Sequence, residues 1–131
     1  MRLLLDTHIA LWAVADDSRL SPAASELIAD PANEVFVSAA SLWEIAIKRG
    51  LARGTANDMP VSAQEALGYF RDAGYALLDI ASAHTVAVER LPMLHADPFD
   101  RILVAQALTV PLRLLTHDAR VARYSDTVIV V

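Results

Sequence analysis

The chain has 131 residues and a net charge of −5, so we expect one domain that spans residues 1–131 and lacks the overall positive charge typical of nucleic-acid-binding proteins. An acidic chain can instead gather divalent cations. It contains no cysteine, which excludes disulfides and thiolate metal sites, and no apolar run of the roughly 20 residues that a membrane span needs. The first apolar run breaks at Asp6, too early for a signal peptide, so we expect a cytoplasmic protein.

Short apolar strands alternate with helices in the first half of the chain. In order, we expect a strand at 2–5, helices at 7–15 and 21–30, a strand at 34–37, a helix at 38–50 and a loop at 51–60. Ser21 and Ser38 are typical N-cap residues, and Gly50 marks the end of its helix.

The second half repeats this alternation. In order, we expect a helix at 61–74, a strand at 75–80, helices at 82–91 and 97–109, a strand at 112–116, a short helical turn at 117–123 and a strand at 127–131. Ser62 and Glu65 form a capping box, and Gly74 marks the end of that helix. Short strands that are apolar on both faces and alternate with helices predict an α/β fold with a mostly parallel sheet. Binding sites in such sheets lie outside the carboxyl ends of the strands.

Aspartates follow two of the expected strands at their carboxyl ends. Asp6 comes directly after residues 2–5, and Asp118 lies two positions beyond residues 112–116. Each has an alternative interpretation, because Asp is a preferred N-cap residue and acids are common in the first turn of a helix. Asp6 can cap the next helix, and Asp118 can be a first-turn acid behind a Thr116 cap.

Glu44 lies in the middle of an unusually apolar helix. With Ser41 and Lys48 it forms one narrow polar stripe. The stripe is either a surface Glu–Lys pair four residues apart or a polar face turned toward a cleft.

The stretch HADPFDRILVAQAL (95–108) carries two further acids, Asp97 and Asp100. Asp97 suits an N-cap, with Pro98 at the first helical position. Asp100 is then either an ordinary acid near the positive end of the helix dipole or a metal ligand.

Taken together, these acids indicate a metal site. Carboxylates that converge on one edge of a sheet repel one another unless cations neutralise them. Oxygen ligands suit Mg²⁺ or Mn²⁺ rather than zinc. Such clusters support metal-assisted hydrolysis of phosphodiesters, and the sequence has no Ser-His-Asp set, P-loop or GxGxxG motif that would indicate another chemistry.

The segments LLLDTH, SLWEIAIK, HADPFDRILVAQA and LLTHD, in this order and spacing, resemble the PIN-domain ribonucleases, and most closely the VapC toxins of bacterial type II toxin–antitoxin systems. The resemblance spans essentially the whole chain. It implies a central parallel sheet in the order 3-2-1-4-5 with helices on both faces, and Mg²⁺- or Mn²⁺-dependent endonucleolytic cleavage of RNA.

The resemblance also implies roles for individual residues. The metal-binding acids correspond to Asp6, Glu44, Asp100 and Asp118, so Asp97 is expected to cap its helix or to support the metal site from outside. Thr7 and Thr116 resemble the hydroxyl positions that orient metal-bound water. His8 and His117 accompany the motifs without an assigned role. Candidates for contact with RNA phosphate are the basic residues Lys48, Arg49, Arg101, Arg120 and Arg123.

The resemblance implies two protein partners, a small antitoxin bound across the acidic groove and a second copy of the chain. Segment 42–70 also has more apolar residues than one sheet face readily covers. These residues either pack in an internal core or form an exposed patch, and an exposed patch favours a homodimer. These residues are Leu51, Met59, Val61, Leu67, Tyr69 and Phe70. Two alternatives remain: a PIN-like protein-binding module without turnover, and a PIN nuclease, such as a general DNA nuclease, outside any toxin–antitoxin system.

Overall fold

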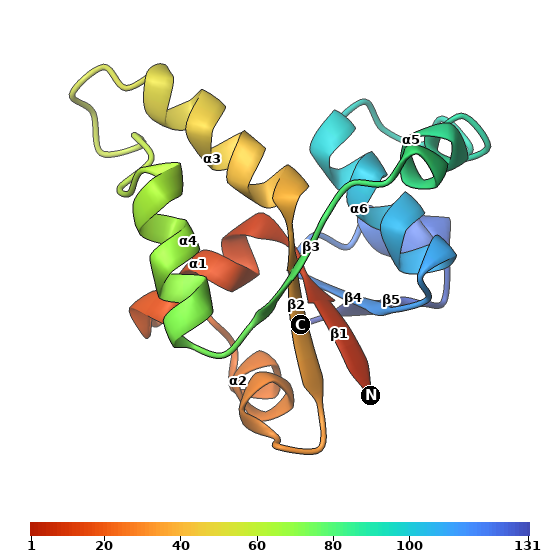
Figure 1. Ribbon diagram of the computed structural model, residues 1–131, viewed down its shortest axis with the longest axis horizontal. Helices are drawn as coiled ribbons and strands as arrows, with labels where there is room; N and C mark the ends of the chain where they lie inside the picture. Colours follow the sequence, from red (N-terminus) through yellow and green to blue (C-terminus); the bar gives the residue numbers. More distant parts are fainter.

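A computed structural model describes residues 1–131, and its centre is a five-stranded parallel sheet in the order β3-β2-β1-β4-β5 (Figure 1). The strands are β1 (Arg2–Leu5), β2 (Glu34–Ser38), β3 (Ala76–Leu78), β4 (Arg113–Thr116) and β5 (Val128–Val130). Leu5 of the central strand pairs with Val37 of β2 and with Leu115 of β4. The carboxyl ends of these three strands therefore meet at one edge, and the strand order predicted from the resemblance is confirmed.

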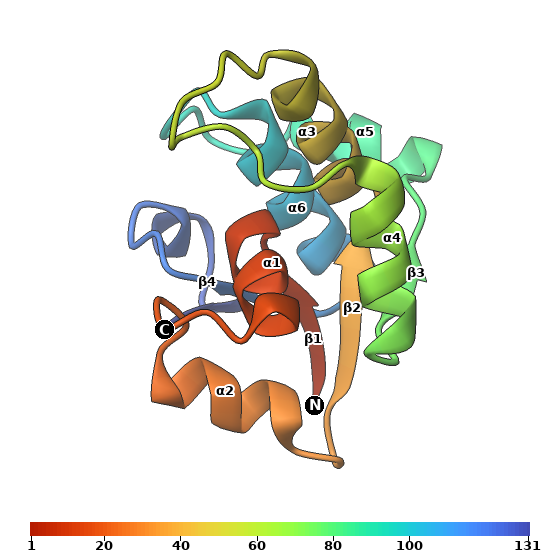
Figure 2. The ribbon, with the colours of Figure 1, turned by 90° about the vertical axis from the view of Figure 1, so that its left-hand side faces the viewer.

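Helices cover both faces of the sheet. The helices are α1 (Thr7–Ala15), α2 (Pro22–Ala29), α3 (Ala39–Gly50), α4 (Ala63–Asp72), α5 (Ser82–Val88) and α6 (Pro98–Thr109), with a 3₁₀ turn η1 (Val121–Tyr124). Helices α1, α2 and α4 pack on one face (Figure 2), and α5, α6 and η1 pack on the other. Helix α3 continues beyond the carboxyl edge and contacts α1, α4 and α6.

Alternate strand residues point to opposite faces of the sheet and build two separate cores. Leu4, Leu114 and Phe36 face the α6 side, whereas Leu5, Leu115 and Val37 face the α1 side. This period of two explains why the strands are apolar at consecutive positions.

Capping residues set the helix boundaries largely as the sequence predicts. Ser21 and Ser38 cap α2 and α3, and Ser62 with Glu65 forms the capping box of α4. Gly74 takes a left-handed conformation (φ +82°) just beyond α4, where an L side chain would be strained. Gly50 is instead the last residue of α3, without a positive φ, so its role is not that of a left-handed cap.

The apolar residues of segment 42–70 divide between the core and the surface. Met59 and Phe70 follow the internal-core alternative and are buried beneath α1 and α4. Leu51 and Tyr69 are exposed, as a dimer interface in this segment requires.

None of the helices combines the length and the apolar character that crossing a membrane demands.

Candidate active site

Asp6 lies where the central strand ends and α1 begins, and its carboxylate does two things. Its Oδ1 accepts a hydrogen bond from the Ile9 amide at 2.9 Å, which caps α1, and its Oδ2 accepts one from the Thr116 hydroxyl at the end of β4. The residue is 6 % exposed. Burial raises the pKa of Asp6, against the opposing effect of these hydrogen bonds. Asp6 is thus both a helix cap and an acid at the carboxyl edge.

Glu44 is buried, with its carboxylate turned toward α1. Oε1 accepts a hydrogen bond from the Thr7 hydroxyl at 2.6 Å, and Oε2 lies 2.7 Å from the Lys48 ammonium. The Ser41 hydroxyl lies 2.9 Å from that of Thr7. The polar stripe of α3 therefore contains the Glu–Lys pair and also faces the edge of the sheet beside Asp6.

The two acids of the 95–108 segment have different environments. Asp97 is exposed, and its Oδ1 accepts hydrogen bonds from the Phe99 amide at 2.9 Å and the Asp100 amide at 3.2 Å, so it is the N-cap of α6. Asp100 is only partly exposed, and its Oδ2 lies 3.1 Å from His95 Nε2. Burial raises the pKa of Asp100, the negative charges of Asp97 and Asp6 raise it further, and the His95 hydrogen bond opposes the rise.

Asp118 is held by a neighbour in its own turn. Arg120 donates to both carboxylate oxygens, with Nη2 at 2.8 Å from Oδ2, and this interaction lowers the pKa of Asp118 to about 2. The Asp118 amide also donates to Thr116 Oγ1 at 3.1 Å, as expected for a Thr116 cap.

The four acids gather at the carboxyl edge, each with its own partner. No three Asp, Glu or His side chains lie close enough together to hold one ion as they stand. The donor set still fits a hard divalent cation, because every group is a carboxylate and burial penalises the charges of both Asp6 and Asp100. Asp6 and Asp100 would hold such an ion, with Glu44 and Asp118 completing its surroundings.

Two hydroxyls hold carboxylates at this edge. Thr7 donates to Glu44, and Thr116 donates to Asp6. Both threonines are buried, so in this structure they fix the acids in place. The orientation of metal-bound water, which the resemblance implies for them, stays a prediction.

Two of the five candidate phosphate-binding residues lie against the acids, Lys48 on Glu44 and Arg120 on Asp118. Arg49 donates to the Met59 carbonyl in the loop after α3, at 2.8 Å, and Arg123 is exposed on η1. The expectation for Arg101 is wrong. It is 7 % exposed, and its guanidinium donates to groups inside the protein, so it does not reach a phosphate.

Aromatic rings border the site beside Asp6. His117 Nδ1 lies 3.9 Å from Asp6 Oδ2, and the His117 ring packs on Trp12 and His8, with centroids 4.9 and 5.5 Å away. Burial lowers the pKa of His8, and the Asp6 charge opposes that shift.

Sequence reasoning missed two residues around Asp100. His95 contacts its carboxylate, and the Tyr124 hydroxyl contacts His95. Both contacts depend on how the loop before α6 folds against η1, and no helical or strand periodicity signals that arrangement. Proximity in sequence to the DPFD motif is the signal that could have singled out His95.

Comparisons with known proteins agree with this architecture. The family model of the PIN domain matches residues 3–126. Ribonuclease VapC22 of Mycobacterium tuberculosis is 34 % identical over 120 residues, which are 90 % of this chain and 88 % of that protein. The crystal structure of VapBC2 from Rickettsia felis, bound to a DNA fragment from their promoter, contains a chain with the same fold. Its TM-score is 0.70 at 18 % identity, over 100 % of this chain and 98 % of the other. The chain therefore belongs to the PIN-domain family, among the VapC ribonucleases.

Proposed function

We propose that this chain, a single PIN domain, is the toxin of a type II toxin–antitoxin system and acts in the cytoplasm as an endoribonuclease that hydrolyses RNA phosphodiester bonds. One observation carries the proposal: Asp6 after β1, Glu44 on α3, Asp100 on α6 and Asp118 after β4 lie at the carboxyl edge of the sheet. Ribonuclease VapC22, with which a third of the aligned residues are identical, supports RNA as the substrate.

We propose Mg²⁺ or Mn²⁺ as the cofactor, held by Asp6 and Asp100 with Glu44 and Asp118 in support. When bound, a divalent ion stabilises the negative charge that develops on the phosphate and the leaving oxygen during hydrolysis. The protein's own side chains position the carboxylates that would bind the ion. Thr116 fixes Asp6 and Thr7 fixes Glu44, so these two carboxylates would lose little conformational freedom on binding an ion.

Lys48 and Arg120 supply positive charge beside these acids. Each is paired with an acid, by Lys48 Nζ to Glu44 at 2.7 Å and Arg120 Nη2 to Asp118 at 2.8 Å, and both are partly or fully exposed. An RNA phosphate at this edge of the sheet can therefore contact the Lys48 ammonium or the Arg120 guanidinium, and neither side chain is a buried, unpaired charge. These two residues offset the repulsion between RNA and a chain of net charge −5.

The test compares two neighbouring acids. Asp100→Asn keeps the size of the side chain but removes its charge, and we expect RNA cleavage with Mg²⁺ to fall at least 100-fold while the fold is retained. Asp97→Asn should cleave within about threefold of the parent, because Asn caps a helix about as well as Asp. Gel assays of RNA cleavage, with Mg²⁺ and with EDTA, measure both. Equal losses in the two folded variants would contradict the assignment, and cleavage of DNA but not RNA would favour the nuclease outside a toxin–antitoxin system.

An antitoxin fits the groove that adjoins the site. A cavity of about 890 Å³ lies between α1, the end of α3, the loop 51–61 and α4. Apolar side chains such as Leu11, Trp12 and Val61 line it, and His8 and Lys48 lie at the end nearest the acids. We propose that an apolar segment of the antitoxin lies here and directs an Arg or Lys toward the carboxylates, where it would compete with the metal.

Leu11→Asp tests that groove. It places a charge among the apolar lining residues, and we expect affinity for the cognate antitoxin to fall at least about tenfold in calorimetry. Leu108→Asp, at an exposed position of α6 that does not line the groove, is the matched control and should bind as the parent does. If the complex of the parent chain with its antitoxin kept full RNA cleavage, the antitoxin would not block the active site.

A further inference from the structure

A line of hydrogen bonds runs from Asp100 into the protein. Asp100 Oδ2 lies 3.1 Å from His95 Nε2, and the other ring nitrogen, Nδ1, lies 2.7 Å from the Tyr124 hydroxyl. That hydroxyl in turn accepts a hydrogen bond from Arg101 Nη1 at 3.0 Å. The His95 side chain is only 10 % exposed, so water competes little for these contacts.

Arg101 is anchored at the inner end of this line. Its Nη1 also donates to the Pro92 carbonyl at 2.9 Å, and its Nη2 donates to the Val88 carbonyl at 3.3 Å. Arg101 follows Asp100 directly on α6, while both carbonyls belong to the end of α5 and the loop after it. The guanidinium therefore ties the loop that carries His95 to the helix that carries Asp100.

The direction of each hydrogen bond follows from the chemistry of the groups. Arginine has only donors and does not lose its proton in proteins, so the Tyr124 oxygen accepts from Arg101. The Tyr124 oxygen also accepts from the His95 amide at 3.3 Å, so these two bonds occupy both of its lone pairs. Its single proton can point to the His95 carbonyl at 3.5 Å or to His95 Nδ1 at 2.7 Å, and the much shorter contact assigns it to Nδ1, which accepts. A neutral imidazole that accepts at Nδ1 carries its proton on Nε2, where it faces Asp100.

We propose that His95, Tyr124 and Arg101 are positioning residues for Asp100: Arg101 orients the Tyr124 hydroxyl, this hydroxyl fixes His95 as the Nε2–H tautomer, and His95 holds Asp100 Oδ2, which would keep the carboxylate oriented for binding a divalent ion. The assignment rests on the proposed metal-dependent function. Groups that orient a metal ligand typically contribute 10- to 100-fold to metal affinity or activity. Arg101 thus acts on the metal site from inside the protein.

Tyr124→Phe is the most selective variant, because it removes one oxygen and keeps the ring. In ¹⁵N-labelled full-length chain, long-range proton–nitrogen NMR spectra report which nitrogen of each histidine carries the proton, and the signals lost in His95→Gln identify His95. We expect the Nε2–H tautomer in the parent and a mixture of tautomers in Tyr124→Phe. We also expect the Mn²⁺ dissociation constant, measured by EPR without RNA, to rise about tenfold in Tyr124→Phe.

Matched variants separate positioning from general loss of structure. Tyr75→Phe alters a half-buried tyrosine that stacks on Phe70 in the other core, and it should change neither readout. His95→Gln keeps an amide donor for Asp100, so it should bind Mn²⁺ more tightly than His95→Leu does. If Tyr124→Phe fails to fold, the comparison of His95→Gln with His95→Leu still tests whether His95 positions Asp100.

Two results would overturn the proposal. One is an Nδ1–H tautomer of His95 in the parent. The other is a Tyr124→Phe or His95→Leu variant that is folded and binds Mn²⁺ as tightly as the parent. A parent chain that binds Mn²⁺ but cleaves no RNA would instead overturn the proposed function, and the tautomer and Mn²⁺ affinities would still support or refute the positioning role.

Discussion

The negative charges of Asp6 and Asp100 lie in surroundings that destabilise the ionised carboxylate. Burial raises the pKa of both carboxyls, and the hydrogen bonds from Thr116 and His95 offset that effect only in part. A group whose pKa is higher in the folded than in the unfolded chain stabilises the fold at low pH and destabilises it after ionisation. In the absence of metal, both acids should therefore lower stability at neutral pH, as is common at functional sites.

We expect Asp6→Asn to be more stable than the parent in EDTA, by roughly 0.5–2 kcal/mol near pH 7. The gain should be near zero below the ordinary Asp pKa of 3.8 and should grow as pH rises through the raised pKa of Asp6, because only the parent loses stability there. The amide oxygen of Asn can still cap α1. Urea unfolding at a series of pH values measures the difference.

Asp17→Asn is the control of opposite sign. Arg19 lowers the pKa of Asp17 to about 2, so this carboxylate adds stability above pH 3.8 that is lost as pH falls toward 2. The Asn variant should be slightly less stable than the parent at neutral pH. If Asp6→Asn also lost stability at pH 7, the Asp6 charge would have to be classed as structural.

The individual acids could be predicted from the sequence, whereas their partners could not. Asp6 and Asp118 follow apolar strands, so the strand pattern alone predicts them at one edge of the sheet. The polar stripe of Glu44 also fits a surface Glu–Lys pair, and the family resemblance was needed to assign Glu44 to the site. Arg101 has the same local pattern as an exposed arginine, and only the packing of the α5–α6 loop buries it. Local sequence carries no information on contacts such as Tyr124 with His95, which lie 29 residues apart.

At the scale of elements, a buried amide network joins β2 to α6 beside the site. Gln106 Oε1 accepts from the Ser38 hydroxyl at 2.6 Å, and its Nε2 lies 3.2 Å from both the Asp79 carbonyl and His84 Nδ1. Ser38 also accepts from the Ala40 amide and so caps α3. The network thus sets the direction of α3, and with it the position of Glu44.

Gln106→Ala should destabilise the chain by about 2–4 kcal/mol, because it leaves a cavity and several buried polar groups without partners. Urea unfolding followed by circular dichroism measures this loss. Gln64→Ala, at an exposed position of α4, should change stability by less than about 0.5 kcal/mol. If Gln106→Ala lost no more stability than Gln64→Ala, water would have to replace the hydrogen bonds of the Gln106 amide.

The element boundaries were predictable wherever capping chemistry is local. Ser21, Ser38, Ser62 and Asp97 each begin a helix at the expected position. The ends were less predictable: the strand expected at 75–80 is only Ala76–Leu78, and the helix expected at 82–91 ends at Val88. Beyond Val88 the chain continues in tight turns, in which the Leu91 amide donates to the Val88 carbonyl, and the Gln106 side chain binds the Asp79 carbonyl just past β3.

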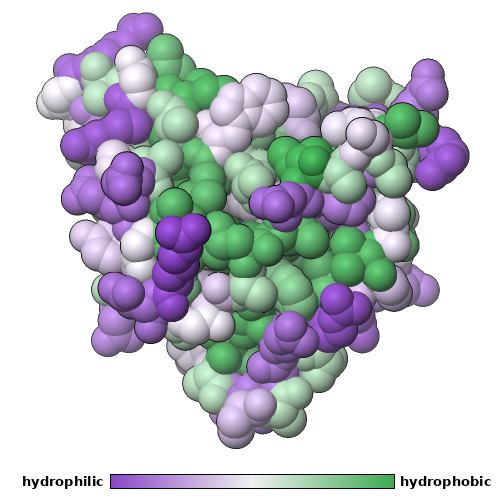
Figure 3. Space-filling view, in the orientation of Figure 1, coloured by the Kyte–Doolittle hydropathy of each residue, from purple (hydrophilic) through white to green (hydrophobic).

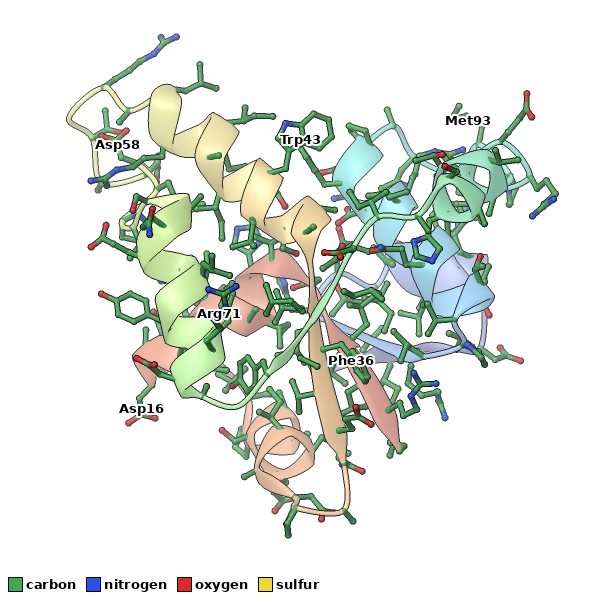
Figure 4. All side chains as sticks on the ribbon, viewed as in Figure 1. Asp16, Phe36, Trp43, Asp58, Arg71 and Met93 are labelled. Atoms are coloured by element: carbon green, nitrogen blue, oxygen red, sulfur yellow. The ribbon has the colours of Figure 1, made fainter.

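At the scale of the whole molecule, hydrophobic residues extend across the middle of the face that β3 borders (Figure 3). Trp43 lies on this face between α3 and α6, where it packs edge-on against Phe99 and stays 58 % exposed (Figure 4). Ile47 and Leu51 continue the exposed apolar stripe along α3. An apolar surface of this kind is typical of a protein interface, and two-fold dimers are the commonest assembly.

We expect a homodimer through this face. Light scattering at micromolar concentration should give a mass near twice 14.2 kDa for the parent. Trp43→Glu should shift the mass toward 14.2 kDa, because the new charge would be buried at the interface. Leu108→Glu, at another exposed apolar position, should remain a dimer. A parent that stays monomeric as its concentration rises would contradict the dimer.

The central place of β1 also determines when the acidic edge can form during synthesis. Asp6 is among the first residues made, yet the hydroxyl that holds it belongs to Thr116, 110 residues later. β2 can pair with β1 early, but the other edge of β1 stays open until β4 has left the ribosome. Closing so long a loop is slow, and an unfinished chain leaves that edge unprotected. A nascent chain that lacks β4 therefore has no assembled nuclease site.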